Sequence, residues 1–282
     1  MENTPQKKLG IIAGGGTLPR RLIHYCQEIG RDFFVLAIEG NAMPDLVDDT
    51  IPHLWLRMGQ AGTGLKRMAQ ENVEEIVMIG TIRRPSFKDL VPDWKTTAFF
   101  AKVGPKALGD DGLLRAIIKE IEAEKMRVVG IQEVMSDLLA KPGILTKKKP
   151  SKADVIDIKR GVGVAFELGK LDVGQSVVVQ EGLVLGVEGI EGTDELIKRC
   201  AGYKRKGSGG VLVKLRKPQQ DMRIDLPTIG ERTLENAKNS GLNGIAVHAG
   251  NTLIVDEEDV IKTANKLGMF IIGIEPGEYL EQ

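Results

Sequence analysis

The chain has little of several features that would assign it to a class at once. Lysine plus arginine and aspartate plus glutamate number 39 each in 282 residues, so the strong positive field of a general nucleic-acid binder is absent. Only two cysteines occur, Cys26 and Cys200, which are too few for a disulfide framework and fit a reducing cytoplasm. These absences argue against a secreted disulfide scaffold and against nucleic acid as a partner.

Long apolar runs are also missing. No uncharged apolar stretch approaches the roughly 20 residues that cross a bilayer, and residues 1–8 are polar, without the apolar centre of a signal peptide. Aromatic residues make up only 4% of the chain, so the core must consist largely of Val, Ile and Leu, as in buried parallel strands that alternate with helices. We therefore expect a cytoplasmic protein that is soluble or peripheral to a membrane.

A strand-then-helix rhythm runs along both halves of the chain. Apolar strands such as residues 9–13 and 76–79 alternate with helical patterns, which predicts a Rossmann-like α/β domain over residues 1–140. Residues 141–155 contain prolines, a glycine and consecutive lysines, a composition typical of a linker. A less regular α/β pattern follows and predicts a second α/β domain over residues 156–282.

The most informative stretch surrounds Asp225. The sequence Asp221-Met-Arg-Ile-Asp225-Leu-Pro-Thr228-Ile-Gly230 lies between a predicted strand and a predicted helix that Thr228 could cap. Asp225 is therefore expected at a strand-to-helix turn, where a carboxylate can hold a metal ion or activate water. The alternative is that this carboxylate only ties the turn to a backbone amide, and the stretch alone favours neither role.

A glycine turn ends the first predicted strand. Gly14-Gly15-Gly16-Thr17 joins this strand to a helix, an arrangement in which backbone amides and the helix dipole bind phosphate. Pro19 stands where the dinucleotide fingerprint needs a third glycine, so the turn favours a nucleotide or phosphate over NAD, although Glu39 could still contact a ribose. The alternative is that the glycines only let helix and strand pack closely.

Two adjacent arginines follow the strand that ends at Ile79. Arg83 and Arg84 are expected at the carboxyl edge of the sheet, where open α/β sheets bind ligands. Paired guanidinium groups suit a pyrophosphate, whereas solvated surface charge is the alternative for either residue.

The candidate metal ligands are all oxygen donors. The three histidines lack the spacing of a zinc site and the cysteines add no zinc pattern, so magnesium or manganese is the expected metal. The available carboxylates are Asp110, Asp111, Glu181, Glu188, Asp194 and Asp225. All six remain candidate ligands at this point, although one of the first two is expected to cap a helix. No nucleophile motif is present, so water would be the attacking species.

Four short motifs, each weak alone, carry a resemblance to a known family. They read LGIIAGGGTLP at residues 9–19, GDDGLL at 109–114, VQEGLVLGVEGIEGTD at 179–194 and RIDLPTIG at 223–230. In this order and spacing they resemble the bacterial UDP-2,3-diacylglucosamine pyrophosphatases of the LpxI type, and the resemblance spans nearly the whole chain. One departure is segment 81–85, which is more basic here than in the family.

The resemblance implies a magnesium-dependent hydrolase of lipid A biosynthesis. Such an enzyme cleaves UDP-2,3-diacylglucosamine to UMP and 2,3-diacylglucosamine 1-phosphate (lipid X), with its active site between two domains. It also implies that Asp225, the aspartate of the last motif, is catalytic. With this family in view, Asp225 is expected to bind the metal or activate water, and Glu181, Glu188 and Asp194 are the other predicted metal ligands. A lipid substrate implies transient, peripheral contact with the inner membrane. The predicted substrate-binding residues are Gly14, Gly15, Gly16, Thr17, Arg83, Arg84, Thr193, Lys214 and Thr228.

Three other functions remain open at the level of sequence. The chain could be a dinucleotide-dependent oxidoreductase, a noncatalytic binding protein for a nucleotide sugar or an acyl lipid, or a hydrolase of another UDP-sugar. In the interpretation that we adopt, apolar walls of the second domain accommodate the acyl chains, and the protein is expected to be a homodimer.

Overall fold

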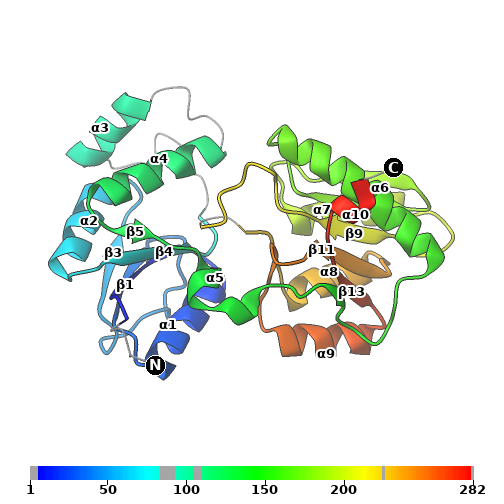
Figure 1. The fold of residues 1–282 in the computed structure, drawn as a ribbon, viewed down its shortest axis with the longest axis horizontal. Helices are drawn as coiled ribbons and strands as arrows, with labels where there is room; N and C mark the ends of the chain where they lie inside the picture. The colour runs from blue at the N-terminus through cyan, green and yellow to red at the C-terminus, as the bar shows by residue number, and fades with distance from the viewer. Residues whose placement is uncertain (1–5, 83–92, 104–109, 224–225, 281–282) are drawn as a thin grey trace. The chain divides into compact units, whose positions relative to one another are not determined.

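The computed structural model describes residues 6–82, 93–103, 110–223 and 226–280. The chain divides into two compact units, Met1–Ser136 and Asp137–Gln282 (Figure 1). Each unit has its own sheet with helices packed against it, so the predicted α/β fold class is confirmed.

The first unit is built on a five-stranded parallel sheet. Its strands are β1 (Leu9–Ala13), β2 (Phe33–Ile38), β3 (His53–Leu56), β4 (Glu75–Ile79) and β5 (Arg127–Val128). They are ordered β3-β2-β1-β4-β5, and every neighbouring pair is parallel. In doubly wound sheets of this order, ligands bind where the order reverses, outside the carboxyl ends of β1 and its neighbour β4.

Helices follow every strand of this sheet except β2. They are α1 (Leu18–Glu28), α2 (Ala61–Gln70), α3 (Trp94–Val103), α4 (Asp110–Ala123) and the short α5 (Ile131–Val134), followed by a 3-10 turn at Ser136–Leu138. Pro19 lies in the first turn of α1, where its missing N–H costs nothing. The buried stripe of α1, formed by Leu22, Ile23 and Cys26, packs in the core at helical spacing.

The second unit contains a six-stranded mixed sheet. Its strands are β6 (Gly143–Ile144), β7 (Ser176–Gln180), β8 (Leu183–Val187), β9 (Val211–Lys214), β11 (Gly244–His248) and β13 (Phe270–Ile274). The order is β6-β13-β11-β9-β7-β8, with a parallel centre of β9, β11 and β13 and antiparallel strands on both sides. A separate parallel pair joins β10 (Thr228–Ile229) to β12 (Leu253–Ile254).

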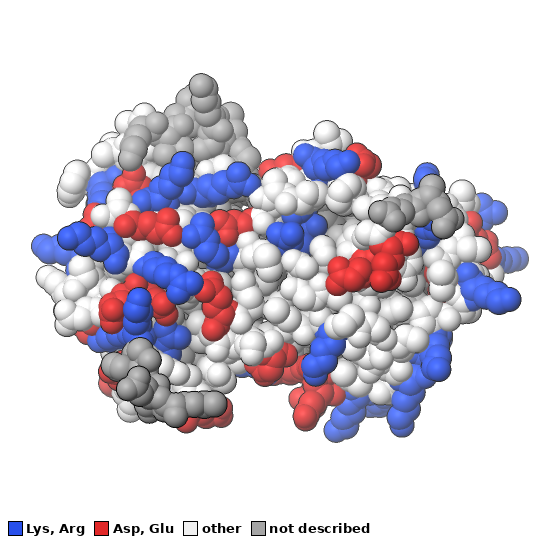
Figure 2. Space-filling view, viewed as in Figure 1, with Lys and Arg blue, Asp and Glu red and all other residues white. Residues whose placement is uncertain are grey.

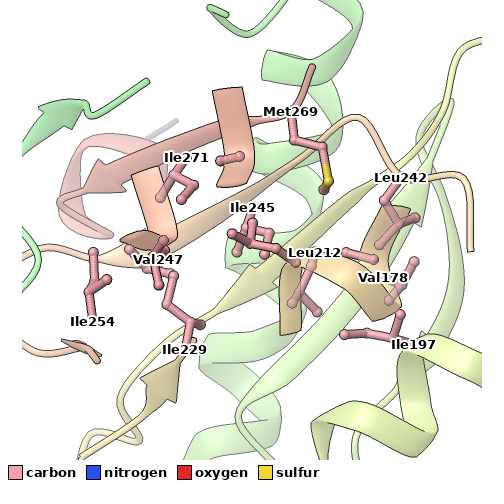
Figure 3. Packing of buried hydrophobic residues seen from close by; sticks show 14 of the residues in the cluster. Val178, Ile197, Leu212, Ile229, Leu242, Ile245, Val247, Ile254, Met269 and Ile271 are labelled. Atoms are coloured by element: carbon pink, nitrogen blue, oxygen red, sulfur yellow. The ribbon is translucent and has the colours of Figure 1, made fainter. Parts of the chain in front are cut away.

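Helices cover both faces of this mixed sheet. They are α6 (Lys152–Lys170), α7 (Thr193–Cys200), α8 (Glu231–Asn239), α9 (Glu257–Leu267) and α10 (Gly277–Leu280), with a 3-10 turn at Ala201–Tyr203. Strand side chains alternate between the faces, so Val211 and Val213 pack with α6 while Leu212 packs with α7, α8 and α9. Figure 3 shows the hydrophobic cluster on the face that α7, α8 and α9 cover. Leu212, Ile245 and Ile271 of the sheet belong to this cluster. In the described part of the chain, no helix combines the length and the apolar character that crossing a membrane requires.

Residues 141–155 are an edge of the second unit rather than a linker. β6 pairs antiparallel with β13, the backbone N–H of Leu145 donates to the carbonyl oxygen of Ile271 at 2.9 Å, and the N–H of Ile271 donates to Thr146 Oγ1 at 3.0 Å. Ser151 then caps α6 by accepting from the N–H of Asp154. The composition was misleading because prolines and lysines are also typical of edge strands, which have solvent on one side.

Candidate functional site

A buried polar cluster lies at the carboxyl end of β9. Lys214, the last residue of this strand, is 7% exposed, and its Nζ donates to Thr193 Oγ1 at 2.9 Å and to the carbonyl oxygen of Thr228 at 3.1 Å. Thr193 Oγ1 in turn donates to Glu188 Oε1 at 2.9 Å. We call Lys214, Thr193, Glu188 and Thr228 the Lys214 cluster. Four residues predicted from sequence therefore come together at one point.

The β7–β8 hairpin brings the acidic member to the basic one. Lys214 pairs with Ser176 in the antiparallel register of β9 and β7. The chain returns along β8, so that the N–H of Glu188 donates to the carbonyl oxygen of Ser176 at 2.8 Å. Thr193 follows as the first residue of α7. Segments far apart in the sequence thus meet at the edge where the parallel strands β9 and β11 end, which is where open α/β sheets bind ligands.

The cluster is electrostatically balanced although it is buried. Glu188 is 7% exposed, and its second oxygen, Oε2, accepts from the backbone N–H of Gln175 at 3.3 Å. The Thr193 hydroxyl has one proton, which goes to the carboxylate, and two lone pairs, one of which accepts from the ammonium of Lys214. Ser176 Oγ lies 3.2 Å from the same hydroxyl. A buried ammonium and a buried carboxylate are tolerated here because one hydroxyl connects them.

Thr228 contributes its carbonyl oxygen rather than a helix cap. Its hydroxyl donates to the carbonyl oxygen of Leu226 at 3.1 Å, and the residue belongs to β10. Gly230 is the N-cap of α8 and makes no side-chain cap hydrogen bond. The expected capping role is therefore wrong, because two residues separate Thr228 from the start of the helix.

Asp194 lies next to the cluster but pairs elsewhere. Its Oδ2 lies 2.6 Å from Arg232 NH2, an ion pair with one half-buried and one exposed partner. Because Asp194 is in the first turn of α7, the positive end of the helix dipole also favours its negative charge.

Glu181 lies at the opposite end of the hairpin from Glu188. It occupies the tight turn after β7 with φ of 53°, and its N–H donates to Asp157 Oδ2 at 3.1 Å. Five residues of extended chain separate it from Ser176, a distance of about 16 Å. Glu181 and Glu188 therefore cannot ligate one ion, although both belong to the same sequence motif.

The structure describes only some of the predicted metal ligands. Among the described residues, no group of three or more His, Cys, Asp or Glu side chains could hold a metal ion. Asp225, Arg83 and Arg84 lie outside the described residues, and nothing is described of the side chains of Asp110 and Asp111. The roles predicted for these residues remain predictions.

His248, one of the three histidines without zinc-site spacing, was not predicted as a site residue from the sequence. It ends β11, beside the strand that ends in Lys214. Burial, and to a smaller extent the guanidinium of Arg216, lower its pKa to about 4. Both His248 Nδ1 and Arg216 Nε are buried and have no hydrogen-bond partner among the described residues. Its position at the end of a predicted strand was the available signal, because such ends share the carboxyl edge.

The glycine turn of the first unit is only partly open to a ligand. The N–H of Gly14 donates to Ile79 and that of Gly15 to Thr81, each at 2.8 Å. A Cβ on Gly14 would lie 2.7 Å from the carbonyl oxygen of Thr81, so close packing explains these two glycines. Gly16, with φ of 92°, and Thr17 are exposed, and an added Cβ on Gly16 would meet open space. Only these last two residues of the turn are open to a ligand.

An open hollow of about 630 Å³ lies beside this turn. Its lining consists of Glu39, Gly40, Asn41, Ala42, Met43, Pro44 and Trp55. The carbonyl oxygen of Asn41 is 2.9 Å from the position of a Cβ on Gly15, which fixes the hollow next to the turn. Glu39, the candidate ribose contact, pairs with Arg57 at 3.1 Å on the surface. Trp55 adds an aromatic face of the kind that stacks on a base.

Fold and site together define a two-domain α/β protein whose polar groups gather at the carboxyl edge of each sheet. The chain matches the family models of the LpxI N-terminal domain over residues 8–138 and of the LpxI C-terminal domain over residues 141–272. The chain therefore belongs to the LpxI family. It is 40% identical over 283 residues to the protein of Caulobacter vibrioides named UDP-2,3-diacylglucosamine pyrophosphatase LpxI, an alignment that covers 96% of this chain and 99% of that protein.

Proposed function

We propose that this chain hydrolyses the pyrophosphate bond of UDP-2,3-diacylglucosamine to UMP and 2,3-diacylglucosamine 1-phosphate, a step of lipid A synthesis. Membership of the LpxI family and the name of the Caulobacter relative support this activity. The structural observation that carries the proposal is the Lys214 cluster, in which a buried ammonium is held at the carboxyl edge of the sheet.

The chemistry needs negative charge to be neutralised where phosphorus is attacked. Charge spreads over the equatorial oxygens of the transferring group in the transition state, and an ammonium that is already oriented in a low-dielectric site stabilises it without reorganisation. In the proposal Lys214 supplies this charge. Glu188 is a positioning residue, since it acts on Lys214 through the hydroxyl of Thr193.

Asp225 is the proposed group that activates water. It precedes Leu226 in the chain and is three residues from Thr228, whose carbonyl oxygen accepts from Lys214. A carboxylate in that role accepts the proton of the attacking water, a contribution of about 100-fold to 10,000-fold in general-base catalysis.

A divalent cation is the proposed cofactor on the strength of the family resemblance. The described carboxylates do not fit such an ion by themselves, because Glu188 faces Thr193, Asp194 pairs with Arg232, and Glu181 lies at the other end of the hairpin. The roles proposed for Lys214, Glu188 and Asp225 therefore do not depend on a metal ion. The requirement for Mg²⁺ or Mn²⁺ is tested separately by chelation.

In the proposal, the first unit holds the nucleotide. Gly16 and Thr17 are the accessible part of the glycine turn, and the hollow with Trp55 and Glu39 is adjacent. Arg83 and Arg84 are proposed to contact the pyrophosphate. We also propose a homodimer in the cytoplasm, and sedimentation of the full chain tests the oligomeric state.

Release of UMP by the purified full chain tests the proposed function. UMP should appear from UDP-2,3-diacylglucosamine with Mg²⁺ or Mn²⁺ and cease in EDTA. Asp225→Ala should lower turnover by at least about 100-fold while changing the free energy of unfolding by only about 1 kcal/mol, the scale of a lost local cap.

Each alternative function predicts a different result. Binding of the UDP-lipid without UMP release under any divalent cation would indicate a noncatalytic binding protein. A saturable change in NADH fluorescence would indicate an oxidoreductase, and faster cleavage of another UDP-sugar would change the substrate. Loss of activity in Asp225→Ala only in proportion to lost folded protein would reduce this residue to a structural role.

A further inference from the structure

Helix α6 exposes apolar side chains along its outer face. Val155 is 45% exposed and Ile156 is 62% exposed, and the segment just after the helix adds Leu171 at 73% and Val173 at 49%. The inner side of the same helix is buried in the core through Ile158 and other residues. α6 therefore carries two apolar surfaces, of which only the inner one has a partner within the unit.

The exposed charges on this helix are almost all positive. Lys152, Lys159, Arg160 and Lys170 are exposed, whereas Glu167 is the only exposed acidic residue of α6. Glu167 pairs with Lys170 at 2.7 Å, and none of the other three cations makes an ion pair with a described acidic residue. The neighbouring α10, which packs on α6, adds the exposed Glu278. Figure 2 shows several Lys and Arg side chains along the right-hand margin of the view, with Asp and Glu side chains among and beside them.

The remaining two acidic residues of α6 point inward and are satisfied there. Asp154 is 2% exposed and accepts from Ser151 and from Asn243 Nδ2, the latter at 2.9 Å. Asp157 is 1% exposed and accepts the N–H groups of Glu181 and Gly182. Both carboxylates serve the fold, so Lys152, Lys159 and Arg160 leave an excess of positive charge on the outer face.

We propose that the outer face of α6, from Lys152 to Val173, docks on a membrane surface that contains anionic phospholipid. Amphipathic helices bind such surfaces by burying apolar side chains at the headgroup boundary while cations meet the lipid phosphates. On the outer face of α6, Val155 and Ile156 lie between Lys152 on one side and Lys159 and Arg160 on the other. The face therefore has apolar side chains flanked by cations, as in such amphipathic helices. The orientation is that of a helix lying on the membrane.

The composition of the face argues against two other occupants. Nucleic acid is bound largely through phosphates and requires cations but no protruding aliphatic side chains. A second copy of this chain, in a two-fold contact, would bring the same unpaired cations against each other. A lipid surface satisfies both the charge and the apolar side chains.

One end of the face adjoins the Lys214 cluster. Val173 precedes Gly174, and a Cβ on Gly174 would lie 2.1 Å from the carbonyl oxygen of Glu188. The docking surface rests on the proposed function in one respect, because the proposed diacylated substrate resides in a bilayer. Docking itself requires no catalysis, so the two can fail separately.

Vesicle flotation with the full chain tests the docking surface. The wild-type protein should float with vesicles of phosphatidylcholine mixed with phosphatidylglycerol, should float poorly with phosphatidylcholine alone, and should be released by salt. The triple variant Lys152→Gln, Lys159→Gln, Arg160→Gln should bind about 100-fold more weakly, because each cation near an anionic surface contributes about fivefold. Ile156→Ser should weaken binding by roughly tenfold, because it removes buried methylene groups.

A matched control uses the other face of the same sheet. Lys238, Lys262 and Lys266 are exposed on α8 and α9, and their replacement by glutamine changes the net charge equally. This control should bind vesicles like the wild type. All variants should keep the wild-type thermal midpoint and should hydrolyse detergent-dispersed substrate at the wild-type rate.

Three results would overturn the docking surface. They are failure of the wild type to float with anionic vesicles, equal weakening by the control triple, and tighter binding of single-stranded nucleic acid than of vesicles through the α6 cations. A protein that floats as expected but releases no UMP would refute the proposed function and leave the docking surface standing.

Discussion

Replacing Thr193 with valine tests whether the Lys214 cluster stabilises the second unit. Valine keeps the shape of threonine and removes one hydroxyl. That hydroxyl accepts from Lys214 Nζ and donates to Glu188 Oε1, each at 2.9 Å. Because Lys214 and Glu188 are each 7% exposed, neither charged group recovers its lost partner from water.

The expected cost is set mainly by the two lost hydrogen bonds to charged groups, since the contact with Ser176 Oγ at 3.2 Å, which is also lost, joins two neutral hydroxyls. A hydrogen bond to a charged group contributes about 1.5 to 3 kcal/mol. Lys214 keeps the carbonyl oxygen of Thr228, and Glu188 keeps the N–H of Gln175, so the lower end of the range applies to each. We expect Thr193→Val to lower the free energy of unfolding of the second unit by about 3 kcal/mol, a large part of the 5 to 15 kcal/mol that stabilises a typical domain.

Urea unfolding followed by two probes measures this effect. The two tryptophans, Trp55 and Trp94, both belong to the first unit, so their fluorescence reports that unit, whereas far-ultraviolet circular dichroism reports both. Thr193→Val should shift a transition seen by circular dichroism and leave the fluorescence transition in place. Thr193→Ser keeps the hydroxyl and should stay within about 1 kcal/mol of the wild type.

Two outcomes would refute the reasoning about Thr193. If Thr193→Val unfolded within about 1 kcal/mol of the wild type, water would be replacing the hydroxyl and the cluster would not be closed. If Thr193→Ser cost as much as Thr193→Val, the lost methyl group rather than the hydrogen bonds would account for the change.

Further predictions concern His248, Glu181 and Gly14. The folded chain excludes a proton from His248 down to about pH 4, whereas the unfolded chain binds one below about pH 6.5, so the stabilising contribution of the neutral ring is lost as the pH falls. In urea unfolding, the wild type should therefore lose about 2 kcal/mol more than His248→Gln between about pH 7 and pH 5; equal losses would contradict this account. Glu181→Gln should keep near-wild-type turnover in the UMP assay while Glu188→Gln should lose at least about tenfold, because only Glu188 orients Lys214; equal losses would show that Glu181 takes part. Gly14→Ala should shift the tryptophan fluorescence transition to lower urea, since its Cβ meets the carbonyl oxygen of Thr81 at 2.7 Å; an unchanged transition would show that the β1–α1 turn can move aside.

The apolar periodicity predicted the main strands because parallel strands buried on both faces are continuous apolar runs. Residues 9–13 and 76–79, for example, are β1 and β4. β6 was not predictable in this way, since it has two residues and lies at the edge of the sheet. Its place is determined by the backbone of β13, more than 100 residues further along the chain, and no local pattern contains that partner.

The candidate site shows the same limit. The family motifs contain Glu188, Thr193 and Thr228, and Lys214 was predicted as a substrate-binding residue outside them; these four residues do meet. Glu181 lies in the same motif as Glu188, but closeness in sequence was misleading, because a hairpin turn sends the two carboxylates to opposite ends of the strands. His248 was not predicted as a site residue because the histidines lack the spacing of a zinc site, although strand pairing brings it beside the end of β9.

The pairing of β6 with β13 also determines when the second unit can fold during synthesis. β6 leaves the ribosome first among the strands of this unit and β13 leaves last. The early strand must therefore remain without its partner until almost the whole polypeptide has been made. Contacts so distant in sequence are slow to form, whereas every strand of the first unit precedes Ser136 and can pair while translation continues. A polypeptide that ends before Phe270 would retain a complete first sheet and an exposed apolar strand edge on the second, the kind of surface that chaperones and proteases recognise.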